Sequence, residues 1–108
     1  MAYNLDLAKR ISTEMEGLPF VEKKMFGGTC FLVNGNMACG VIGDGLIVRF
    51  PPEKHADLLK GPHVKPFDFS GKPMKGWLVV EAKGYKSDVQ LSTWIKLGVD
   101  FALTLPPK

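Results

Sequence analysis

Residues 23–50, KKMFGGTCFLVNGNMACGVIGDGLIVRF, decide the fold of this chain. Two turn dipeptides interrupt its apolar runs, first Asn34-Gly35 and then Asp44-Gly45. Both dipeptides suit a type I′ turn, which requires positive φ at its two central residues. We therefore expect two β-hairpins in series, and their register determines which side chains share a face of the sheet.

Two-residue loops at both turns sort the side chains into two faces, because successive residues of a strand point to opposite sides. We assign one continuous apolar face to the core beneath the helices. It holds Cys30, Leu32, Met37, Cys39, Val41, Leu46, Val48 and Phe50. Its burial, at about 1.5–3 kcal/mol for each large side chain, is expected to be the main stabilising contribution.

The opposite face is also more apolar than a solvent-facing surface requires. Its apolar patch predicts an interface with a second copy of the chain or with another protein. The candidate interface residues are Phe31, Val33, Ile42, Ile47 and Arg49. The alternatives are scattered surface hydrophobes, which are normal when single, and an arginine that only extends its charged end into water.

Cys30 and Cys39 are directly opposed in this register, at a site without ladder hydrogen bonds. There the Cα atoms lie about 4.5 Å apart, within the range that a disulfide tolerates. The two residues are therefore a candidate redox pair. The alternative is two small buried side chains that stay reduced, and a three-residue loop after Val33 would remove the pairing.

Helical patterns flank the hairpins. Residues 4–16 predict a helix capped by Asn4, residues 52–60 a short helix, and residues 77–80 a strand. Residues 61–76 are loop-like, although Phe67 and Phe69 alternate with Asp68 as in a short strand. A last helix starts at Ser87, whose capping box with Gln90 satisfies two backbone donors. The expected order is α-β-β-β-α-β-α.

Composition bounds the class of protein. The chain has 108 residues, which predicts one domain over residues 1–108, and a mild net charge of +3. The basic residues are scattered and no second arginine lies near Arg49, so nucleic-acid binding is only weakly supported. We expect no secretory signal and no membrane span. Two cysteines without an export signal predict a reducing, cytoplasmic location.

The sequence shows no constellation for catalysis, metal binding or cofactor binding. His55 and His63 are separated by a Gly-Pro break and lie far from the cysteines in sequence. A thiol nucleophile would need Cys30 or Cys39 beside His55, yet both thiols are expected in the core. Gly27-Gly28 lacks the further glycines and the helix of a phosphate-binding loop, so it indicates a bend at strand entry. We expect no catalytic residue, no metal and no cofactor.

The hairpin segment resembles the N-terminal domain of the TfoX/Sxy family, and the similarity extends over nearly the whole chain. The residues that carry it are Lys24-Met25-Phe26-Gly27-Gly28, Phe31, Asn34-Gly35-Asn36-Met37, Gly40-Val41, Leu46, Arg49, Pro66-Phe67, Met74, Trp77 and the helix from Leu91 to Ala102. The resemblance implies a two-layer α+β fold, with helices on one face of a mostly antiparallel sheet, similar to type III secretion chaperones.

Family founders are competence regulators linked to transcriptional activation alongside another regulator, and they carry a second, C-terminal domain. The resemblance implies no catalytic residues. Our first hypothesis is a non-enzymatic interaction or regulatory domain that acts through protein contacts, as a homodimer or with a partner. The alternatives are a nucleic-acid-associated transcriptional regulator, and a small ligand-binding protein or enzyme of unknown reaction.

Overall fold

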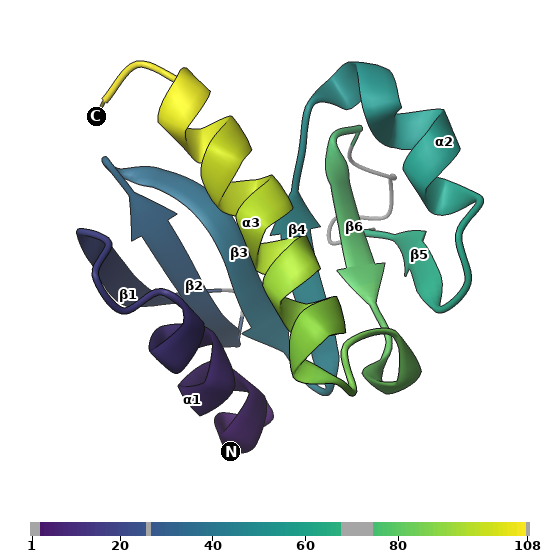
Figure 1. Ribbon diagram of the computed structural model, residues 1–108, viewed down its shortest axis with the longest axis horizontal. Helices are drawn as coiled ribbons and strands as arrows, with labels where there is room; N and C mark the ends of the chain where they lie inside the picture. The colour runs from purple at the N-terminus through teal and green to yellow at the C-terminus, as the bar shows by residue number, and fades with distance from the viewer. Residues whose placement is uncertain (1–2, 26, 68–74, 108) are drawn as a thin grey trace.

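A six-stranded antiparallel sheet forms one layer of the computed structural model, which describes residues 3–25, 27–67 and 75–107 (Figure 1). The strands are β1 (Phe20–Met25), β2 (Gly28–Val33), β3 (Asn36–Ile42), β4 (Gly45–Arg49), β5 (Val64–Pro66) and β6 (Trp77–Val80). Their order in the sheet is β1-β2-β3-β4-β6-β5, with every neighbouring pair antiparallel. The structure adds β1 and β5 to the expected strands.

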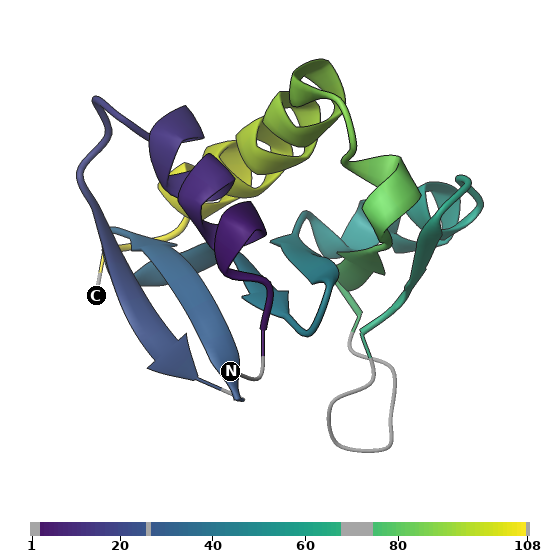
Figure 2. The same cartoon turned by 90° about the horizontal axis from the view of Figure 1, so that it is seen from below.

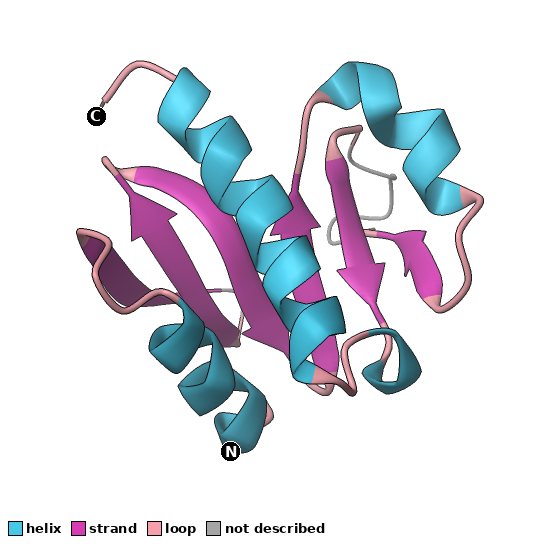
Figure 3. Ribbon diagram, viewed as in Figure 1, coloured by secondary structure: helices cyan, strands magenta, loops and turns pink. Residues whose placement is uncertain are grey.

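Helices form the second layer (Figure 2). They are α1 (Leu5–Glu14), α2 (His55–Leu59) and α3 (Asp88–Thr104), with 3-10 turns η1 (Pro52–Lys54) and η2 (Ala82–Gly84) between elements. All three helices pack on the same side of the sheet, where α2 lies beside β5 and β6 (Figure 3). The expected two-layer α+β fold with helices on one face is confirmed.

Local signals act as the sequence predicts at the helix starts. Asn4 Oδ1 accepts a hydrogen bond from the Leu7 amide at 3.0 Å, and so caps α1. Ser87 and Gln90 form both hydrogen bonds of the capping box at the start of α3. These contacts satisfy backbone donors that a helix leaves without partners in its first turn.

The first turn has the predicted conformation, but the second is displaced by one residue. Asn34 and Gly35 both have positive φ, at 54° and 81°, as a type I′ turn requires. In the second hairpin Ile42 pairs with Gly45, so the loop is Gly43-Asp44 and not Asp44-Gly45. Gly43 supplies the positive φ at the first loop position, which is where a type II′ turn places glycine.

A β-bulge in β3 overturns the predicted register farther from the first turn. Val33 pairs with Asn36 and Leu32 with Met37 as expected, but Phe31 pairs with Cys39, so Ala38 is an extra residue. Beyond an extra residue, the side chains of the bulged strand point to the opposite face, relative to those of the partner strand, from the one expected without a bulge. Cys30 consequently pairs with Gly40, and the predicted opposition of Cys30 and Cys39 is wrong.

The main core lies between the sheet and the helices. Side chains from α1 and α3 meet those of the four central strands there. Its buried members include Leu7, Ile11, Met15, Phe31, Val33, Cys39, Val41, Leu46, Val48, Phe50, Leu78, Val80, Leu91, Ile95 and Val99. The helix α3 comes so close to the sheet at Gly98 that a Cβ at that position would collide with the Ala38 carbonyl of β3.

Candidate functional site

The structure separates the five residues of the predicted interface. Phe31 and Val33 are fully buried beneath the helices, so their assignment to the open face is wrong, and the bulge is the physical reason. Ile42 and Ile47 lie on the face of the sheet that carries no helix, hereafter the helix-free face. Ile42 is partly exposed there, but Ile47 is buried, so its assignment to an open surface is wrong. Arg49, at the end of β4, lies between two aromatic rings.

The helix-free face is apolar, as expected, but with a different membership. Cys30, Leu32 and Met37 replace Phe31 and Val33 there. This second cluster consists of Cys30, Met37, Ile47, Phe67 and Val79, with Leu32, Ile42 and Trp77 packed against it at partial exposure. Phe67 follows β5 and lies 6.1 Å from Trp77 between ring centroids, so it covers part of this face.

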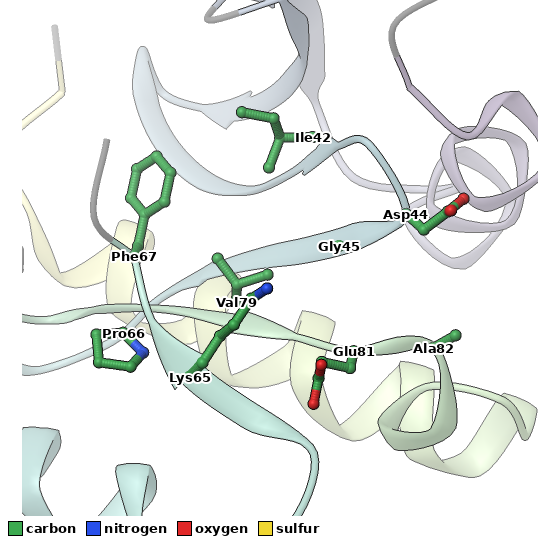
Figure 4. Close-up of a pocket in the computed structure, with 9 residues that line it drawn as sticks. All are labelled: Ile42, Asp44, Gly45, Lys65, Pro66, Phe67, Val79, Glu81 and Ala82. Carbon is green, nitrogen blue, oxygen red and sulfur yellow. The ribbon is translucent and has the colours of Figure 1, made fainter. Parts of the chain in front are cut away.

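One hollow on the helix-free face is large enough for a ligand. It has a volume of about 630 Å³ and lies where β4, β5 and β6 run side by side (Figure 4). It is lined by Ile42, Asp44, Gly45, Lys65, Pro66, Phe67, Val79, Glu81 and Ala82. Pockets that bind small molecules have volumes of about 300–1,000 Å³ and mostly apolar walls with a few polar groups. We call this hollow the sheet pocket.

The floor of the sheet pocket depends on the absence of a side chain at Gly45. Gly45 lies opposite Ile42 on the neighbouring strand, so both residues share the helix-free face. A Cβ at Gly45 would lie 2.5 Å from Cγ1 of Val79. Any larger residue would therefore push against Val79 and fill the floor of the pocket.

Three charged side chains surround the sheet pocket, namely Asp44, Lys65 and Glu81. All three are exposed, and none takes part in an ion pair within the part of the chain that the structure describes. Asp44 and Glu81 lie toward the end where β4 begins and β6 ends, whereas Pro66 and Phe67 lie toward the other end (Figure 4). The pocket therefore has an acidic end and an apolar end.

The acidic end is held in place by contacts to α1 and η2. Asn4 donates through Nδ2 to Asp44 Oδ1 at 3.2 Å, and its backbone N–H donates to the Gly43 carbonyl at 2.8 Å. The Tyr85 hydroxyl donates to the Asp44 carbonyl at 2.6 Å. Burial raises the pKa of Tyr85, and the charge of Asp44 raises it further against the opposing effect of Arg10. The loop at Gly43-Asp44 is thus a preformed wall.

The described lining of the sheet pocket combines apolar walls with three charged side chains. Among the residues that the structure describes, the lining contains no histidine, cysteine or serine that could act as a nucleophile or as a proton carrier near neutral pH. Across residues 3–25, 27–67 and 75–107, no three His, Cys, Asp or Glu side chains gather as a metal site needs. His55 instead accepts a hydrogen bond at Nδ1 from the Gly76 amide at 3.2 Å, which is a structural contact.

Arg49 connects the two layers at the end of the sheet. Its guanidinium carbon lies 5.1 Å from the Trp77 ring centroid and 5.4 Å from that of Phe101. Partial burial lowers the pKa of Arg49 from its ordinary value. The cation therefore joins β6 to α3 through two cation–π contacts.

The two thiols are free and buried on opposite sides of the sheet. Burial raises the pKa of Cys30 to about 11. Burial, with a smaller contribution from Cys30, raises the pKa of Cys39 to about 12. Both side chains are neutral thiols near pH 7, so neither has the thiolate that redox exchange requires.

Comparison with known families identifies the family of this chain. The sequence profile of the TfoX N-terminal domain matches residues 16–102. This chain belongs to the TfoX N-terminal domain family. The match confirms the resemblance and supports a domain like that of the competence regulators. A search of curated proteins returned no match to the chain. Of the residues that carried the resemblance, Phe26 and Met74 lie outside the described part of the structure.

Sequence reasoning missed most of the sheet pocket. Ile42 alone among its described lining residues was predicted to belong to an interface, because Lys65, Phe67 and Glu81 belong to segments whose place in the sheet could not be read from local pattern. The alternation around Phe67 was the available signal, but the short strand β5 is Val64–Pro66 and ends just before it. Phe69 lies outside the described residues.

No helix in the described part of the chain combines the length and the apolar character that crossing a bilayer requires.

Proposed function

We propose that this chain is a non-enzymatic regulatory module of the TfoX N-terminal type, and that it acts by binding another protein through its helix-free face. The observation that supports this proposal most is the sheet pocket, a preformed hollow with an apolar floor and exposed charged side chains around it. Apolar hollows with polar rims are the usual docking sites for anchor side chains of a partner.

The described lining residues include no histidine, cysteine or serine, which favours binding over a reaction. Acid–base or covalent catalysis needs a titratable group or nucleophile in contact with a partner that activates it. The three charged residues of the rim, Asp44, Lys65 and Glu81, are exposed and unpaired with one another. Such groups select a ligand by charge and contribute to the rate of encounter more than to chemistry.

Affinity capture with charge variants tests the proposal. Lys65→Glu and Glu81→Lys alter the rim at exposed positions, so both variants are expected to fold. Val89→Lys is the matched control, because Val89 is an exposed residue of α3 in the other layer. Tagged proteins expressed in the source cells are captured, and bound proteins are quantified by mass spectrometry.

We expect at least one protein that the wild type and Val89→Lys retain and that at least one rim variant loses. The same set of bound proteins with all four baits would contradict the proposal.

A further inference from the structure

The polarity of the sheet pocket points to the kind of segment that it binds. We propose that the pocket takes an extended peptide segment in which an apolar residue and a lysine or arginine lie two positions apart. This inference rests on the proposed function, since it specifies what the partner presents to the same surface.

The apolar end fits one medium-sized side chain. Ile42, Phe67 and Val79 provide its walls, and Gly45 leaves the floor open. Phe67 and Val79 are almost completely buried, so these walls have a fixed position before a ligand arrives. Because the apolar wall is already in place, the protein loses less conformational entropy when a ligand binds.

The acidic end favours a cation. Among the described lining residues, Asp44 and Glu81 place two carboxylates there against the single ammonium of Lys65 nearer the middle of the pocket (Figure 4). Because no described cation pairs with Glu81, its carboxylate is available to a ligand. The Asp44 carboxylate accepts from Asn4 and keeps further acceptor capacity. A basic side chain is the complement of this end.

Spacing follows from the geometry of an extended chain. Side chains at positions i and i+2 of a strand point to the same side and lie about 6.5–7 Å apart. One of them can enter the apolar end while the other reaches the carboxylates.

Titration of the full chain with short peptides tests the inference by nuclear magnetic resonance. The test peptide is acetyl-Gly-Leu-Ser-Lys-Gly-amide, and two companions replace its lysine by glutamate or its leucine by glycine. We expect amide shifts at Ile42, Gly45 and Val79 with the test peptide. We expect about fivefold weaker binding for the glutamate peptide, because an exposed attraction becomes a repulsion.

Protein variants give the second arm. Glu81→Gln should reduce the preference for lysine over glutamate, whereas Glu16→Gln, at an exposed position after α1, should leave it unchanged. Absence of shifts at the pocket, equal binding of the lysine and glutamate peptides, or an unchanged preference in Glu81→Gln would overturn the inference. If the peptide experiments gave one of these results but affinity capture still found a partner that depends on the rim, the proposed function would remain supported. Peptide binding with the expected preference but no rim-dependent partner would count against the proposed function alone.

Discussion

At the scale of single residues, Gly98 shows how one missing side chain determines the distance between the layers. Its position in the middle of α3 is unfavourable for helix formation by about 0.5–1 kcal/mol relative to alanine. The same position lies against the Ala38 carbonyl in the bulged part of β3, where a Cβ cannot fit without a shift. Packing and helix propensity therefore act in opposite directions here.

We predict that Gly98→Ala lowers the free energy of unfolding by about 1–3 kcal/mol, because overpacking outweighs the gain in propensity. Urea denaturation followed by circular dichroism measures this. Ser92→Ala, at an exposed position of the same helix, is the control and should be neutral or slightly stabilising. A Gly98→Ala protein more stable than the wild type would show that α3 does not approach β3 this closely.

The buried thiols make stability depend on pH. In the unfolded chain a cysteine titrates at about pH 8.5, whereas burial raises the pKa of Cys30 to about 11 and of Cys39 to about 12. Above the unfolded pKa the native state holds protons that the unfolded state has lost, so stability decreases as pH rises. Below that value the contribution of the thiols is fully present.

We predict that the free energy of unfolding falls between pH 9 and pH 11, by up to about 1.4 kcal/mol per pH unit for each thiol. The double variant Cys30→Ala with Cys39→Ala should show a shallower decrease, because the two buried thiols no longer contribute. Urea unfolding at a series of pH values provides the comparison. Identical slopes for the two proteins would argue that the thiols are accessible to water.

At the scale of elements, the sequence was informative wherever a local signal determines a local structure. The Asn34-Gly35 turn, the Asn4 cap, the Ser87 capping box and the strand from Trp77 to Val80 all form as predicted. The bulge at Ala38 has no such signal in the sequence, and its carbonyl lies against Gly98 of α3, far away along the chain. Because the prediction did not include this bulge, it placed Phe31 and Val33 on the open face and Cys30 and Leu32 on the core face. The structure shows the reverse.

Arg49 is the clearest contact between elements that a charge variant can probe. We predict that Arg49→Gln lowers the free energy of unfolding by about 1–2 kcal/mol, since two cation–π contacts of about 0.5–1 kcal/mol each are lost. Thermal or urea denaturation measures the change. Lys83→Gln, at an exposed position in η2, removes the same charge and should have little effect. Equal stability of the two variants would mean that the aromatic contacts of Arg49 contribute nothing.

At the scale of the whole molecule, charge and surface determine what the chain can meet. The net charge is +3, and its lysines are dispersed over both layers and the connecting loops. Tight nucleic-acid binding requires several phosphate contacts from one basic surface.

We predict no shift of a 30-base-pair duplex in an electrophoretic assay at low salt and micromolar protein. Low salt strengthens contacts to DNA phosphates, so weak DNA binding would be easiest to detect under these conditions. A shift that disappears as salt is added would favour the nucleic-acid-associated regulator. A homodimer stays a prediction at this scale, and sedimentation over a range of concentrations measures it.

The central claim is that the sheet pocket is the surface by which this domain meets its partner. Site-specific photocrosslinking in the source cells tests it most directly. The photoreactive residue p-benzoylphenylalanine replaces Lys65 at the pocket or, as control, Lys96 on the exposed side of α3. We predict a discrete crosslinked protein from position 65 that position 96 does not give. Crosslinks from position 96 alone, or from neither position, would contradict the account.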